Sequence, residues 1–176
     1  MKLPQKRIVL ALLLILILGG LALMAAPQRK AIIIVQPNSP IEIIRYTAQF
    51  HERGTSSRYN TECIEHSLDH KNRGTQKVVA IRFGLFSFDV FNRFLATTGG
   101  ISMDDLVPGK TSSGNRWAHN PYAAFSFLTG VAYVDLVRLE DGTIWQADEA
   151  TVLAEIRKIE KDFDSKLLKE KEGPGR

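Results

Sequence analysis

Five residues that could bind a metal ion or act in catalysis lie within nine positions: Glu62, Cys63, Glu65, His66 and His70. On an α-helix, Glu62, His66 and His70 would line one face at four-residue spacing with Cys63 beside them, a ligand set that suits zinc or copper. On a β-strand the same residues divide between two faces, because successive side chains point in opposite directions. Two histidines four residues apart on a strand are separated by ~13 Å, too far to share one ion. The secondary structure of residues 59–71 therefore decides whether these side chains can form a metal site.

The residues around this cluster favour the strand. Thr61 and Ile64 are β-branched, and residues 70–74 have the composition of a turn. We therefore expect a polar strand with no metal site. The alternative is a zinc- or copper-handling envelope protein that uses Cys63, His66 and His70.

Other signals for catalysis are weak. The chain has no Gly-x-Ser-x-Gly motif, and Gly99-Gly100 lacks the lysine of a phosphate-binding loop. Asp104-Asp105 is more simply explained as a turn before Leu106. Cys63 is the only cysteine, so an exported domain would have no internal disulfide, and burial is the default for a free thiol. The sequence predicts a protein that is not an enzyme and binds no cofactor.

A segment between two expected strands carries residue types that are typical of binding surfaces. Arg116, Trp117 and Tyr122 lie in or beside residues 115–124, and Trp, Tyr and Arg dominate binding hot spots. They predict an interaction surface. The alternative is that the aromatic side chains close the end of the fold.

The N-terminus carries a membrane-targeting segment. Residues 8–26 contain no charge and follow three basic residues, the layout of a secretory signal. The run is also long enough to span a bilayer core of ~30 Å. Pro27 would hinder cleavage after Ala26, because proline lacks the N–H and fixes φ. We expect an uncleaved single-pass anchor, in the lipid bilayer through residues 8–26, with the body outside the cytoplasm; export after cleavage is the alternative.

The net charge of +4 depends on the residues that precede this run. Without those three basic residues, 20 Lys and Arg stand against 19 Asp and Glu, and 20 − 19 = +1. A nearly neutral body has no electrostatic surface for nucleic acid, which we exclude as a partner.

Residues 31–148 consist of short runs rich in β-branched and aromatic residues, separated by turn signals. Residues 77–92 and 125–139 are the strongest runs. Both faces of residues 77–92 are largely apolar apart from Arg82, which predicts a central strand. About seven strands are expected, with no helical period between them. Asp141-Gly142 predicts a two-residue hairpin turn. These patterns predict a mostly β protein, an antiparallel β-sandwich.

The C-terminal segment has a different period. Val152, Ile156, Ile159, Phe163 and Leu167 recur at intervals of three or four residues, which predicts an amphipathic helix over residues 149–172. We expect its apolar stripe to pack on the sandwich; alternatives are a helix that docks a partner or one that pairs two copies of the chain. The expected organisation is an anchor or signal (1–30), a sandwich (31–148), this helix (149–172) and a disordered tail (173–176).

Residues 77–114 resemble the FxLYD type of bacterial extracytoplasmic domain. In that family an aromatic-rich strand ends in Asp, and a Leu-x-Pro-Gly turn leads into the next strand. The matching segments here are Leu85-Phe86-Ser87-Phe88-Asp89 and Leu106-Val107-Pro108-Gly109. This chain departs from the pattern at Leu85, Ser87 and Phe88. The resemblance implies an immunoglobulin-like sandwich without catalytic residues, and we expect it to bind a protein or envelope component.

Overall fold

Residues 29–55 and 58–168, which the computed structural model describes, form eight strands and three short helical segments. The strands are β1 (Lys30–Ile33), β2 (Ile41–His51), β3 (Cys63–Asn72), β4 (Val78–Asp89), β5 (Phe94–Ser102), β6 (Thr111–His119), β7 (Phe127–Leu139) and β8 (Ile144–Gln146). The helical segments are η2 (Ala124–Ser126), α2 (Glu149–Ile156) and η3 (Ser165–Leu168). The expected membrane segment and C-terminal tail lie outside the described residues. No helix within the described ranges is long and apolar enough to cross a membrane.

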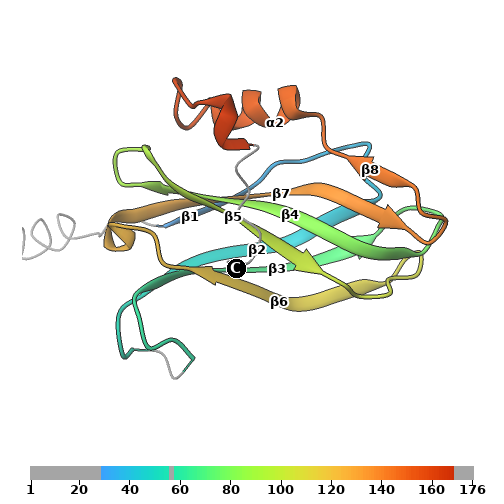
Figure 1. Ribbon diagram of the computed structural model, residues 1–176, viewed down its shortest axis with the longest axis horizontal. Helices are drawn as coiled ribbons and strands as arrows, with labels where there is room; N and C mark the ends of the chain where they lie inside the picture. Colours follow the sequence, from blue (N-terminus) through green and yellow to red (C-terminus); the bar gives the residue numbers. More distant parts are fainter. Residues whose placement is uncertain (1–28, 56–57, 169–176) are drawn as a thin grey trace, which may run out of the picture.

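The strands form two sheets that face each other (Figure 1). One sheet has the order β2–β3–β6, and the other has the order β1–β7–β4–β5, with β8 also paired to β7. The β1 strand runs parallel to the first half of β7, and β8 runs antiparallel to its second half. The prediction of a mostly β protein with two sheets is confirmed, but the expected antiparallel pairing does not hold for β1, which runs parallel to β7.

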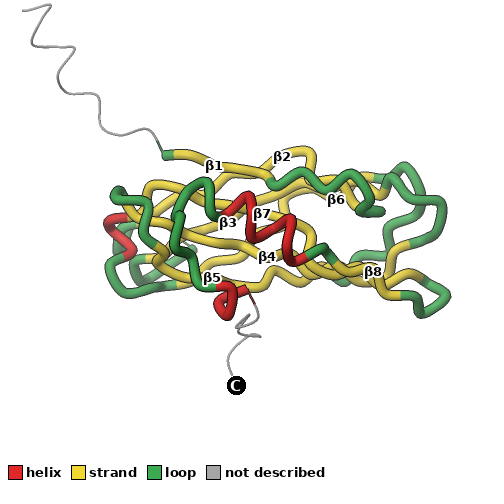
Figure 2. The backbone as a smooth tube through the Cα atoms, turned by 90° about the horizontal axis from the view of Figure 1, so that it is seen from above, coloured by secondary structure: helices red, strands yellow, loops and turns green. Residues whose placement is uncertain are grey.

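Strands β4 and β7 of the five-stranded sheet have buried residues on both faces, because the C-terminal segment forms a third layer over the outside of this sheet. In β4, Phe83 and Leu85 point toward the three-stranded sheet, whereas Phe86 and Phe88 point to the outside of the five-stranded sheet. There they are covered by α2 and the segment after it, which lie across the sheet (Figure 2). Complete burial of such a side chain contributes ~1.5–3 kcal/mol, so both layers contribute to stability.

The C-terminal helix is shorter than expected. It begins at Glu149, where the carboxylate of Asp148 accepts a hydrogen bond of 3.1 Å from the N–H of Thr151, but it ends at Ile156. The following residues form turns, and the Asp164 side chain accepts a hydrogen bond of 2.9 Å from the N–H of Lys166 at the start of η3. Val152, Ile156 and Phe163 of the apolar stripe are buried against this chain's own sheet, and Leu168 is buried beside them.

Two turns also differ from expectation, and a glycine pair lies inside a strand. The β3 strand continues to Asn72, and the turn lies at residues 73–77. The β5 strand runs through Gly100, where a Cβ atom would stand 2.7 Å from the indole ring of Trp117, so a larger residue has no room. Between β7 and β8 only Gly142 has a positive φ, of 89°, and its N–H donates to the Leu139 carbonyl at 3.0 Å. This geometry is a three-residue loop with Gly142 in the left-handed position, not the expected two-residue turn.

Buried Asn72 joins the turns at one end of the sandwich. Its Nδ2 donates to the carbonyl oxygens of Gln76 and Leu106, each at 2.8 Å, and its Oδ1 accepts from the N–H of Gly74 at 2.8 Å. The Leu-x-Pro-Gly turn lies beside it, and Gly109 has a φ of 79°. Position three of a type II turn requires such an angle, so the predicted turn is confirmed.

Candidate functional site

Four inward-facing polar side chains form a hydrogen-bonded cluster between the sheets. The Nδ1 atom of His66 lies 2.7 Å from the hydroxyl of Tyr46, and its Nε2 atom lies 3.3 Å from Oγ of Ser87. The same Oγ lies 3.4 Å from Nε2 of His119. The rings of His66 and His119 are stacked, with 5.1 Å between centroids and 13° between planes. We call Tyr46, His66, Ser87 and His119 the buried histidine cluster; it draws on β2, β3, β4 and β6.

Burial keeps this cluster uncharged near neutral pH. Desolvation lowers the pKa of His66 well below its usual value of 6.5, and the nearby His119 lowers it further. Desolvation also lowers the pKa of His119 to about 4 and raises the pKa of Tyr46 well above 10. A neutral imidazole has one donor and one acceptor nitrogen, and the two hydroxyl groups can rotate to match either tautomer of His66.

A serine beside a histidine that contacts a third group is the arrangement of nucleophilic hydrolases. Here the arrangement lacks access to solvent, because Ser87 and His66 are both 0% exposed. The lowered pKa also makes His66 a poor base at neutral pH. The cluster ties four strands together, although Nδ1 of His119 has no hydrogen-bond partner among the described residues. The Ser87–His66 pair cannot receive a substrate unless the sandwich opens.

We therefore expect Ser87 not to react with a fluorophosphonate probe in the folded protein. Mass spectrometry of the intact chain would show no adduct after incubation at neutral pH. The Ser87→Ala variant is the matched control for reaction at other hydroxyl groups. An adduct that forms on the native chain and disappears in Ser87→Ala would show that the serine is an accessible nucleophile.

The β3 strand separates the three candidate metal ligands. Cys63 lies on the outer face of the three-stranded sheet with Glu65, whereas His66 and His70 point into the core. Cys63 is buried, and burial together with the charge of Glu65 raises the pKa of its thiol. In the part of the chain that the structure describes, no group of three or more His, Cys, Asp and Glu side chains could hold a metal ion.

The three residues of the predicted interaction surface are likewise separated. Arg116 lies on the outer face of the three-stranded sheet, where its Nη1 atom is 3.5 Å from Oε1 of Glu65. Trp117 points to the core, with its ring centroid 5.6 Å from that of Phe83. Tyr122 is exposed in the loop between β6 and β7. Adjacent residues of a strand face opposite sides, so Arg116 and Trp117 cannot form one surface.

A cluster around Glu65 was not predicted from the sequence. This carboxylate is nearly buried on the outer face, where it accepts a hydrogen bond of 2.8 Å from the Tyr59 hydroxyl. Arg58 and Arg116 lie 3.8 Å and 3.5 Å from it. The two guanidinium groups compensate its charge, so the cluster holds the loop before β3 against the sheet.

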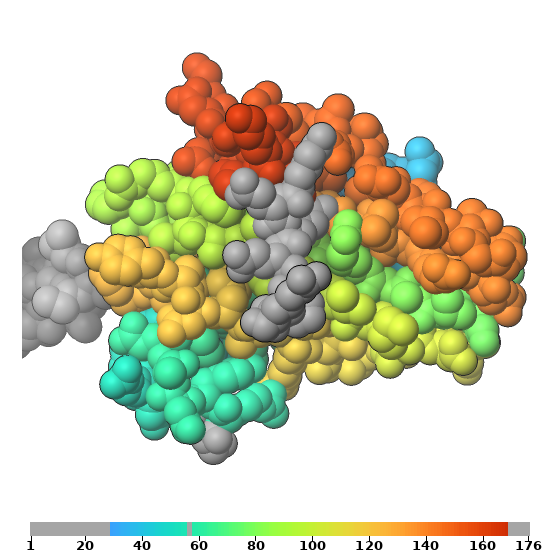
Figure 3. Space-filling view, in the orientation of Figure 1, coloured from blue at the N-terminus to red at the C-terminus, as the bar shows by residue number. Residues whose placement is uncertain are grey.

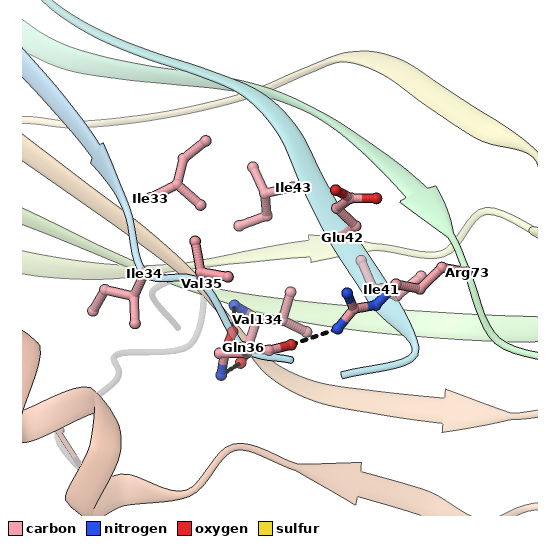
Figure 4. A pocket seen from close by; sticks show the side chains of 9 residues that line it. All are labelled: Ile33, Ile34, Val35, Gln36, Ile41, Glu42, Ile43, Arg73 and Val134. Carbon is pink, nitrogen blue, oxygen red and sulfur yellow. Dashed lines mark hydrogen bonds between the residues drawn. The ribbon is translucent and has the colours of Figure 1, made fainter. Parts of the chain in front are cut away.

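One small cavity lies between β1 and β2, where the edges of the two sheets approach each other (Figure 4). Its volume is ≈ 80 Å³, and most of its lining is apolar, with Glu42 and Arg73 at its rim. The Gln36 amide exchanges two hydrogen bonds with the backbone of Val134, at 2.9 and 2.8 Å, and so continues the sheet edge after β1. Small-molecule pockets usually have volumes of ~300 Å³ or more, so this cavity suits at most one side chain.

A wider apolar groove lies on the outer face of the five-stranded sheet. We call it the sheet groove; it has a volume of ≈ 190 Å³ and is lined by Ala80, Ile81, Arg82, Ile101, Leu136, Arg138 and Ile144. Ile101 and Ile144 are exposed. Arg82 is paired with Asp135, and Arg138 is exposed. The groove is therefore an apolar surface flanked by two guanidinium groups.

Comparisons with known proteins give little beyond this geometry. No protein-family model matches the chain, and no curated protein matches it. A crystal structure of a hypothetical protein from Peptoclostridium difficile 630 is similar over 68% of this chain and 92% of that chain, with 8% sequence identity and a TM-score of 0.46.

Proposed function

We propose that this chain is a non-enzymatic, membrane-anchored binding domain with an immunoglobulin-like fold that works outside the cytoplasm. The strand order supports the fold. The order β2–β3–β6 opposite β5–β4–β7–β8 corresponds to A–B–E opposite C′–C–F–G of immunoglobulin-like sandwiches, with β1 as an additional edge strand. The relation to FxLYD domains agrees with the role of Asp89, whose Oδ1 accepts from the N–H groups of Phe91 and Arg93 at 2.8 Å each.

The contrast between the core and the surface carries the proposal that the protein binds rather than catalyses. The Ser87–His66 pair is sealed inside the sandwich, whereas the sheet groove leaves Ile101 and Ile144 in contact with water. The cavities described above are smaller than the pockets that usually hold small molecules. An open apolar groove flanked by arginines suits the side chains of a protein or other envelope component.

The proposed location rests on the sequence upstream of β1. Residues 8–26 are uncharged and long enough to span a bilayer, and β1 starts only four residues later, at Lys30. The groove would then lie outside the cytoplasm, toward the end of the sandwich opposite Lys30, where other envelope proteins can reach it.

Photo-crosslinking in intact cells tests whether the protein binds a partner through the sheet groove. A photoreactive residue at Ile101 should give discrete adducts that are lost when Ile144→Asp places a charge in the groove. Thr47→Asp is the matched control, because Thr47 is exposed on the outer face of the other sheet. Adducts that survive Ile144→Asp, or that are lost equally in Thr47→Asp, would contradict binding through the groove.

The same cells test the anchor. The chain should stay in the membrane fraction after an alkaline wash, with the 19.7 kDa mass of the uncleaved protein. A soluble chain that starts near Ala26 would refute the anchor and leave the result at the groove intact.

A further inference from the structure

The start of β1 and four exposed apolar side chains lie at the same end of the sandwich. Lys30 pairs with Thr129 near the start of β7, and Thr129 pairs on its other side with Phe88 near the end of β4. The loops of residues 90–93 and 120–126 leave from this end, where the N–H of Val90 donates to the Ser126 carbonyl at 3.0 Å. We call residues 29–30, 52–55, 58–62, 90–93 and 120–126 the proximal end; Figures 1 and 3 show these segments at the same end of the sandwich.

The proximal end exposes apolar side chains that are large and close together. Tyr122 is 98% exposed, Phe91 73%, Phe125 69% and Val90 42%. Single exposed apolar residues are common on proteins, but a group of four on two hydrogen-bonded loops is typical of an interaction site. The phenylalanines of β4, only a few residues away, are completely buried. The four exposed side chains of the proximal end are therefore not part of the core.

The length of chain before β1 indicates which partner covers this surface. The inference rests on the proposed anchor. Four residue steps separate Ala26 from Lys30, a span of ~14 Å at most. The interfacial layer on each side of a bilayer core is roughly 5–8 Å thick, so an anchor that ends at Ala26 keeps the proximal end in or beside the lipid headgroups.

The exposed charges at this end are mostly basic. The loops and residues 29–30 carry Arg29, Lys30, Arg53, Arg58 and Arg93 against exposed Glu52 and Glu62. Two further carboxylates, Glu65 and Asp89, are buried behind Arg58 and Arg93. The guanidinium of Arg93 lies 5.3 Å from the centroid of the Phe91 ring. Tyrosine and tryptophan side chains are enriched at both membrane–water interfaces. Exposed positive charges are attracted to anionic headgroups wherever the facing leaflet contains them.

We propose that the proximal end is a membrane-contact surface, with Tyr122, Phe125 and Phe91 inserted among the lipid headgroups. The domain then stands on the bilayer, and the turns at residues 73–77, 103–110 and 140–143 point away from it. In this orientation the sheet groove opens to the side, parallel to the membrane, where a neighbouring protein can reach it.

Spin labels on the full chain in vesicles test this orientation. The vesicles contain equal parts of phosphatidylcholine and phosphatidylglycerol, and Cys63→Ala removes the native thiol. A label at Tyr122→Cys should be poorly accessible to a water-soluble nickel reagent and readily accessible to oxygen, which dissolves in the bilayer. A label at Val107→Cys, in an exposed turn at the opposite end, should remain accessible to nickel and serves as the control.

The outcomes separate this inference from the anchor on which it rests. Vesicle flotation reports the anchor, and a chain that does not float refutes both. A chain that floats while its Tyr122 label stays in water overturns the membrane contact and leaves the anchor standing. A Tyr122 label that is water-exposed in pure lipid but shielded in native membranes would assign the surface to a protein partner and also overturn the proposal.

Discussion

Phe163→Ala should lower the free energy of unfolding by about 3–5 kcal/mol, although this residue lies outside the sandwich in a segment of turns. Its side chain is 2% exposed. The ring centroid lies 5.7 Å from that of Phe86, 6.2 Å from that of Phe88 and 5.5 Å from that of Phe94. Removing it would leave a cavity over the outer face of the five-stranded sheet, which no other aromatic side chain from the C-terminal segment fills.

Urea unfolding of the full chain in detergent, followed by tryptophan fluorescence, measures this loss. Phe125→Ala is the matched control, because it removes the same side chain from an exposed position and should change stability by less than about 0.5 kcal/mol. Equal losses for the two variants would mean that the C-terminal segment contributes no more to stability than an exposed loop.

Acid should destabilise the domain through the buried histidine cluster. The pKa of His119 is lowered to about 4, and that of His66 is also lowered, whereas unfolded histidines titrate near 6.5. Between these values the unfolded state binds protons that the folded state excludes. The stability that the neutral histidines contribute is therefore complete above pH ~6.5 and is lost as the pH drops. For His119 the loss is at most about 1.4 kcal/mol per pH unit as the pH falls toward its folded pKa of about 4.

Comparing the wild type with His119→Gln isolates the contribution of one histidine. Glutamine does not titrate, and its amide can still hydrogen-bond to Ser87, so the variant should show a shallower loss of stability between about pH 6.5 and pH 4.5. Urea unfolding at several pH values gives both curves. If the curves have the same slope over this range, His119 is not buried in its neutral form.

The positions of the strands, and the burial of β4 on both of its faces, could be predicted from local pattern. Residues 77–92 are largely apolar on both faces, and they form β4, which has a neighbour on each side and buried residues on both faces. Alternation follows from strand geometry alone, so it needs no knowledge of the rest of the fold. The same alternation correctly separates Cys63 from His66 on β3.

Local pattern failed where a distant segment decides the conformation. The C-terminal stripe has helical spacing as far as Leu167, yet the chain leaves the helix after Ile156. The turns let Phe163 reach the aromatic residues of β4, and this contact with Phe86 and Phe88 outweighs the local helical preference. Gly99-Gly100 has the composition of a turn, but Gly100 stays in a strand because Trp117 of another sheet lies over it.

Residues a few positions apart are enough to predict the strand-rich body, the positions of most strands and the apolar segment upstream of β1. Which side chains meet depends on the pairing of distant strands. His66, Ser87 and His119 come from three strands, and no spacing along the chain predicts that their polar atoms lie within 3.4 Å. The same holds for Tyr122, Phe91 and the start of β1, which share one end only because of the order in which the strands pair. Strand pairing is set by the sum of many long-range packing contacts, and that sum is not encoded at any single position.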